Sequence, residues 1–154
     1  MADLLTHVLV AFSLGTLLSW RYEAIKKHHI TLLMIGSALP DLTRIGLIID
    51  PARVEWVSFS YFPLHTVVGA GLTAVILSTM VKDDMAFPFI FSGALTHFFL
   101  DSLLINVTGH SYAMFWPMSP YAPPTPGLYL STDMWPAVIA GTVAIILWIY
   151  GRKR

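Results

Sequence analysis

Five long apolar runs, each close to the length of a membrane-crossing helix, constrain this sequence more than any other feature. The runs cover residues 4–20, 30–50, 64–81, 86–107 and 135–150. A helix needs about 20 apolar residues to cross the hydrocarbon core of a bilayer, and the runs lack the period-two alternation of strands. Charged residues make up only 12% of the chain, against about a quarter in soluble domains. We therefore predict an all-α, single integral membrane domain over residues 1–154, a bundle of about five transmembrane helices.

The basic residues between these runs predict the orientation of the bundle. One side would carry Arg21, Lys26, Lys27, Lys82, Arg152, Lys153 and Arg154. The other side would carry only Arg44 and Arg53. Because Lys and Arg accumulate on the cytoplasmic side, we expect a multi-pass protein of the cytoplasmic membrane with its N-terminus outside and its C-terminus in the cytoplasm. A net charge of zero and the lack of a basic stripe argue against a nucleic-acid partner.

Pro40 interrupts the second run, directly after Gly36 and Ser37. A proline inside a helix removes one backbone hydrogen bond, so we expect helix two to break at Pro40. Broken backbone at membrane depth is tolerated where it is buried in protein or lines a wet cavity. Asp41 would then lie at the N-terminus of a restarted segment, where a negative charge is favoured.

The polar residues inside the runs predict a single site. His97 and Asp101 are four residues apart, so they share one face of a helix. In the predicted topology His7, Asp41 and His65 also lie in the outer halves of their spans. Ionisable groups in a membrane are expensive unless they are paired or bind an ion. Five such residues at one depth, from four helices, are therefore expected to meet.

Imidazole and carboxylate groups predict a metal site. The chain has no cysteine, so a metal would be held by nitrogen and oxygen, a donor set that zinc accepts. We expect His7, Asp41, His65, His97 and Asp101 to hold one or two zinc ions, and other divalent metals would suit the same donors. A catalytic zinc lowers the pKa of bound water to about 7. Asp41 would orient or deprotonate that water, Arg44 would bind a phosphate oxygen, and His110 would contact the substrate.

Plainer interpretations of the same residues stay open. His97 and Asp101 could be a buried hydrogen-bonded pair, and Asp41 could form an ion pair with Arg44 one turn on. His65 could cap the third helix. His28 and His29 are interpreted as interfacial residues of the cytoplasmic loop, and Asp83 and Asp84 as residues of a turn on the face away from the predicted site.

Several blocks resemble the YdjM/YbcI family of small integral membrane proteins, which are described as metal-dependent hydrolases. The blocks are Thr6-His7, Gly36-Ser-Ala-Leu-Pro-Asp41, Leu64-His65-Thr66, Thr96-His97-x-x-x-Asp101 and Phe115-Trp-Pro-Met-Ser119. The ligand order is also similar to that of zinc-dependent phospholipase C. That resemblance implies that Asp41, His65, His97 and Asp101 hold one zinc and that His7 and Asp101 share a second.

These observations together predict a membrane-embedded metal-dependent hydrolase. The expected activity is that of a phosphoesterase acting at the outer face on a lipid-linked substrate, with membrane lipids as partners. The alternative is a non-enzymatic membrane protein in which the polar cluster is a structural metal site or translocates an ion or a proton. The sequence does not define the oligomeric state.

Overall fold

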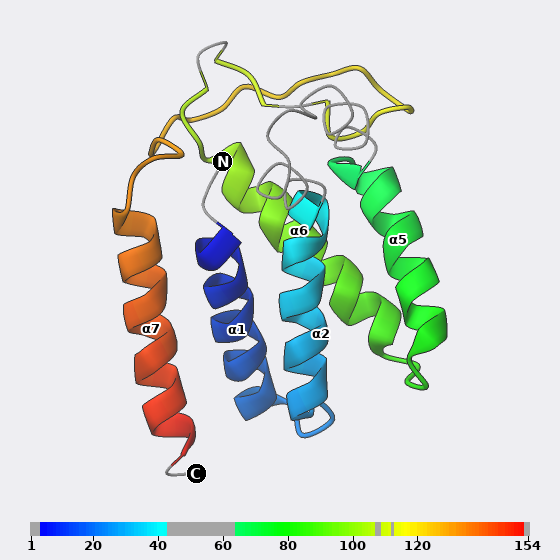
Figure 1. Cartoon of the computed structure of the whole chain (residues 1–154), viewed down its shortest axis with the longest axis vertical. Helices are drawn as coiled ribbons and strands as arrows, with labels where there is room; N and C mark the ends of the chain where they lie inside the picture. Colours follow the sequence, from blue (N-terminus) through cyan, green and yellow to red (C-terminus); the bar gives the residue numbers. More distant parts are fainter. Residues whose placement is uncertain (1–3, 43–63, 107–108, 112, 153–154) are drawn as a thin grey trace, which may run out of the picture.

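The computed structural model describes residues 4–42, 64–106, 109–111 and 113–152, and these residues form an all-helical fold (Figure 1). Its five α-helices are α1 (Leu4–Arg21), α2 (Lys27–Ala38), α5 (Val67–Met80), α6 (Ala86–Ser102) and α7 (Trp135–Gly151). A 3₁₀ turn, η1 (Leu39–Asp41), follows α2. Within the described ranges there is no β-strand beyond isolated bridges. The all-α prediction is confirmed for this part of the chain.

Length and composition single out one helix of the described part of the chain as a candidate membrane span. Among the described residues, α1 is the one helix long and apolar enough to cross a membrane. Two others, α5 and α7, are apolar but shorter. The five-span bundle therefore stays a prediction, although the helices lie alongside one another as such a bundle requires (Figure 1).

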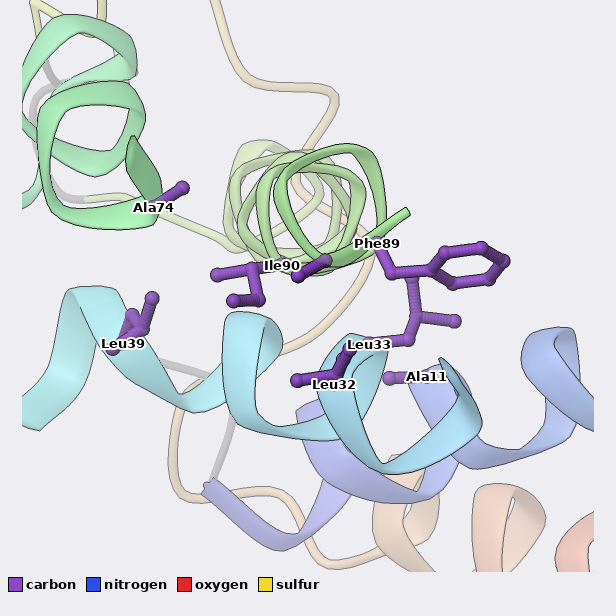
Figure 2. Close-up of a cluster of buried hydrophobic side chains, with 8 residues drawn as sticks. Ala11, Leu32, Leu33, Leu39, Ala74, Phe89 and Ile90 are labelled. Atoms are coloured by element: carbon purple, nitrogen blue, oxygen red, sulfur yellow. The ribbon is translucent and has the colours of Figure 1, made fainter. Parts of the chain in front are cut away.

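The helix α6 lies at the centre of the packing, against α1, α2 and α5, while α7 packs against α1. Two glycines allow α2 and α6 to touch through their backbones. A Cβ on Gly36 would overlap the Ile90 carbonyl, and a Cβ on Gly93 would overlap the Leu33 carbonyl. Figure 2 shows the apolar core beside this contact, with Leu33 and Ile90 among its members. The two helices are thus fixed closely relative to each other.

The turn that ends α2 and the start of α5 place polar residues at one end of the bundle. The α-helix α2 stops at Ala38, just before Pro40, and η1 then carries Asp41. The predicted continuation of this segment to residue 50 lies outside the described residues. At α5, the Thr66 side chain accepts a hydrogen bond from the Gly69 N–H at 3.0 Å. This N-cap fixes the backbone directly after His65.

The helix α6 ends at Ser102, before the residue 107 expected from the sequence. The loop that returns over this end supplies its hydrogen bonds. The Leu128 N–H donates to the Leu103 carbonyl at 2.9 Å, and the Ile105 N–H donates to the Tyr129 carbonyl at 2.8 Å. The backbone leaves the helix here because the loop offers partners that lie far along the chain, which hydropathy alone does not reveal.

Candidate metal centre

Five polar side chains meet at the end of the bundle where η1 lies. His7 comes from α1, Asp41 from η1, and His97 and Asp101 from α6. His65 precedes α5 directly. All five are buried, and the most exposed of them, Asp41, retains only 7% of its accessible surface. The structure therefore brings together the five residues that the sequence nominated as ligands.

His97 is oriented by a backbone carbonyl. Its Nδ1 lies 2.8 Å from the Ser37 carbonyl oxygen, which can only accept a hydrogen bond, so Nδ1 carries the proton. In the neutral ring, the free lone pair is then on Nε2. That atom lies 3.5 Å from Asp101 Oδ2 and 4.0 Å from Asp41 Oδ1. A histidine held in this way by its second nitrogen is typical of a metal ligand.

Asp101 is shared by three imidazoles. Its Oδ2 accepts a hydrogen bond from His65 Nε2 at 3.0 Å and lies 3.5 Å from His97 Nε2. Its Oδ1 lies 3.4 Å from His7 Nε2. The two carboxylate oxygens thus face different histidines, as they would in a carboxylate shared between two cations.

The ring of His7 stacks on that of His97, with 3.8 Å between centroids and 16° between planes. The stacking brings a histidine of α1 and a histidine of α6 side by side within the centre.

Several polar atoms of the centre lack a hydrogen bond of good geometry within the described part of the chain. They are His7 Nδ1, His7 Nε2, His97 Nε2 and Asp101 Oδ1. Leaving such groups buried and unsatisfied costs about 1–3 kcal/mol each. Cation binding would offset that cost.

The ligand atoms form two overlapping groups compatible with a metal ion. One comprises His7, His97 and Asp101, and the other comprises Asp41, His65 and His97. Within each group the ligand atoms lie within 4.8 Å of one another. Since only Nε2 of His97 is available, His97 can serve one ion, and Asp101 is the residue able to connect two.

The three predicted catalytic residues are placed differently. Asp41 lies in the centre. His110 is exposed in the returning loop, where it pairs with Pro124 in an isolated bridge, and it belongs to neither ligand group. Arg44 lies outside the described residues, so its predicted contact with phosphate stays a prediction.

A second polar cluster lies at the opposite end of the bundle, where the sequence suggested only loop and turn residues. His28 Nε2 and His29 Nε2 lie 2.6 Å and 2.9 Å from Asp83 Oδ2. The Met85 N–H, together with these two histidines, lowers the pKa of Asp83 to about 2. The Lys26 N–H donates to His29 Nδ1 at 3.0 Å, so Nε2 carries the proton of a neutral His29. This cluster is therefore better explained as polar contacts that hold α2 to the α5–α6 turn than as a metal site.

Comparison with protein-family models, curated proteins and solved structures found no match to this chain. The resemblance to the YdjM/YbcI family stays a prediction.

Proposed function

We propose that the protein is a membrane-embedded metal-dependent hydrolase, a phosphoesterase that acts on a lipid-linked substrate at the outer face. The observation that carries this proposal is the arrangement around Asp101, which is within 3.5 Å of imidazole nitrogens from His7, His65 and His97. An isolated buried ion pair requires only one pair of residues. Here a larger buried set of nitrogen and oxygen donors comes together from separate elements.

Zinc is the metal that this donor set favours, because imidazole and carboxylate together suit zinc better than magnesium or calcium. In the division implied by the resemblance to phospholipase C, Asp41, His65, His97 and Asp101 would hold one ion, and His7 and Asp101 would hold the second. The two carboxylate oxygens of Asp101 lie beside different histidines, which supports this division.

When bound, zinc would supply Lewis acidity and a lowered pKa for water at the site. The protein supplies the positioning. Ser37 holds His97 in the ligand tautomer, and η1 presents the Asp41 carboxylate, which would orient the water or take up its proton. In this proposal Arg44 would bind a phosphate oxygen, and His110 would contact the substrate.

The surface supports a membrane location. Large apolar side chains are exposed along α5 and α7, including Leu72, Ile76, Val138 and Ile145. Leu72 and Ile76 are one turn apart on α5, so their exposed side chains adjoin, and soluble monomers rarely expose large contiguous apolar patches. Figure 1 places the α1–α2 and α5–α6 connections at the end where α7 finishes. These connections and the helix ends beside them carry the basic residues of the described part of the chain, away from the metal centre. By the charge rule this end faces the cytoplasm and the metal centre faces outward.

Asp101→Asn tests the proposal, with Asp84→Asn as a matched control in an exposed turn. We expect purified wild-type protein to contain one to two zinc ions per chain by elemental analysis and to hydrolyse bis(p-nitrophenyl) phosphate. Asp101→Asn should lose most of the zinc and lower the hydrolysis rate by more than about 100-fold, since even outer residues of metal sites contribute about 10–100-fold. Full zinc content in Asp101→Asn would refute the assignment.

The burial of all five residues also favours a second candidate, a structural metal site with closed coordination. In that case wild-type protein would hold zinc without hydrolysing a phosphoester, and chelation would unfold it. An ion or proton relay instead predicts transport across vesicles without a stoichiometric metal.

A further inference from the structure

An apolar groove of about 370 Å³ lies between α1, α7 and the end of α6. Its walls include Leu14, Leu17, Leu103, Ile139 and Val143, and only apolar atoms form its surface. The volume is at the lower end of the range for small-molecule sites, about 300–1,000 Å³. A purely apolar groove of this size selects an apolar occupant.

The groove opens sideways to the surface of the bundle. Leu17 on α1 is 47% exposed, and Ile139 on α7 is 55% exposed. These side chains lie at the rim, between two helices that pack side by side (Figure 1). In the proposed membrane location, a lipid chain could enter here directly from the bilayer without crossing water.

The inner end of the groove adjoins the metal centre. Its lining includes Thr6 and Leu100, which directly precede His7 and Asp101. The Tyr129 hydroxyl donates to the Leu100 carbonyl at 2.9 Å and fixes the returning loop over this end. In both α1 and α6, a residue that lines the groove is therefore followed directly by a residue of the metal centre.

We propose that this groove binds one acyl chain of a phospholipid whose phosphate lies at the metal centre. The groove offers no polar surface to a peptide backbone, whose unsatisfied groups would be costly there, whereas a hydrocarbon chain needs none. The assignment of the head group rests on the proposed hydrolase function, whereas the assignment of the chain rests on the groove and on the proposed membrane location.

Val143→Trp tests the groove, because Val143 lines it and a larger side chain would fill it. Val138→Trp is the matched control, a more exposed valine of the same helix that does not line this groove. Each protein would be incubated in detergent micelles with one equivalent of phosphatidylglycerol carrying a diazirine on its palmitoyl chain. After illumination, mass spectrometry would locate the cross-links.

We expect wild type and Val138→Trp to be labelled at groove residues such as Leu17 and Ile139. In Val143→Trp, we expect the labelling of these residues to be at least fivefold weaker. Unchanged zinc content and helical circular dichroism would show that Val143→Trp is folded. If it is misfolded, the narrower Val143→Phe takes its place. Equal labelling of these residues in folded variants and wild type would overturn the proposal.

A hydrolysis assay separates this proposal from the hydrolase proposal. Val143→Trp should raise the KM for phosphatidylglycerol about tenfold and leave cleavage of the chain-free bis(p-nitrophenyl) phosphate unchanged. If the wild type cleaves neither substrate, the hydrolase proposal fails, and the cross-links still decide whether the chain binds. An equal loss of hydrolysis on both substrates, with the labelling of groove residues retained, would count against binding of the acyl chain in the groove.

Discussion

At the scale of single residues, the hydrogen bond from His97 Nδ1 to the Ser37 carbonyl matters most for the site. The spacing of His97 and Asp101 is visible in the sequence, but the partner of Nδ1 is not. Ser37 is 60 residues away and contributes a backbone atom, which no side-chain pattern can indicate. The ligand candidates were therefore predictable, whereas the group that orients the most central histidine was not.

Asp83 provides a residue-scale prediction about pH. The Met85 N–H and the two histidines lower its pKa from an ordinary value of 3.8 to about 2. A carboxylate with a lowered folded-state pKa stabilises the fold above about pH 4, and that contribution disappears as the pH falls towards 2. Asp83→Asn should thus lower the thermal unfolding midpoint at pH 5, with a difference from wild type that vanishes near pH 2.

Thermal unfolding of wild type, Asp83→Asn and Asp84→Asn across pH 2–6 measures this effect. The Asp84→Asn variant controls for removal of a charge from the same turn. A difference between Asp83→Asn and wild type that stays constant over the whole range would contradict the assigned pKa.

At the scale of elements, the contact between α2 and α6 depends on having no side chain at Gly36 and Gly93. The sequence indicated a break at Pro40, and α2 ends just before it. The sequence did not indicate that Gly93 would contact the Leu33 carbonyl, because a glycine in an apolar run can have several structural roles. The sequence also predicted that α6 would end further along the chain than it does. The loop that terminates this helix is distant in sequence, so its contacts with the helix end could not be predicted.

Gly93→Ala tests this backbone contact. The added methyl group would push α6 from α2, and overpacking of this kind costs about 1–3 kcal/mol. His97 lies one turn further along α6, so zinc content should fall as well. Denaturant titration and elemental analysis measure the two effects.

Gly141→Ala is the control for Gly93→Ala, since its nearest neighbour would be Leu9 at 3.8 Å, an ordinary contact. It should be neutral or gain about 0.5–1 kcal/mol, because glycine weakens a helix interior relative to alanine. A Gly93→Ala protein as stable and as rich in zinc as Gly141→Ala would show that the backbone contact is dispensable.

At the scale of the whole molecule, hydropathy and charge predicted the helical class and the placement of His7, Asp41 and His65 near His97. The membrane topology itself stays a prediction. It can be tested cleanly because the chain has no cysteine. Tyr121→Cys, in the returning loop, should react with a membrane-impermeant maleimide in intact cells. Glu23→Cys, in the α1–α2 connection, should react only after permeabilisation.

Both of these positions are exposed, so a failure to react reflects the side of the membrane and not burial. The reverse labelling pattern would place the metal centre on the cytoplasmic face. Reaction of both cysteines in intact cells would argue against a membrane between them.

The sharing of Asp101 by histidines from α1, α6 and the segment before α5 has a consequence for how the molecule matures. A partly assembled chain, with any one of these pieces undocked, would offer too few donors to retain an ion tightly. If the centre binds a metal as proposed, metal capture would be a late step that completes an already correct arrangement, and a chelator would loosen three helix contacts at once. Cells starved of the metal should accumulate a chain that has inserted but that proteases still cut.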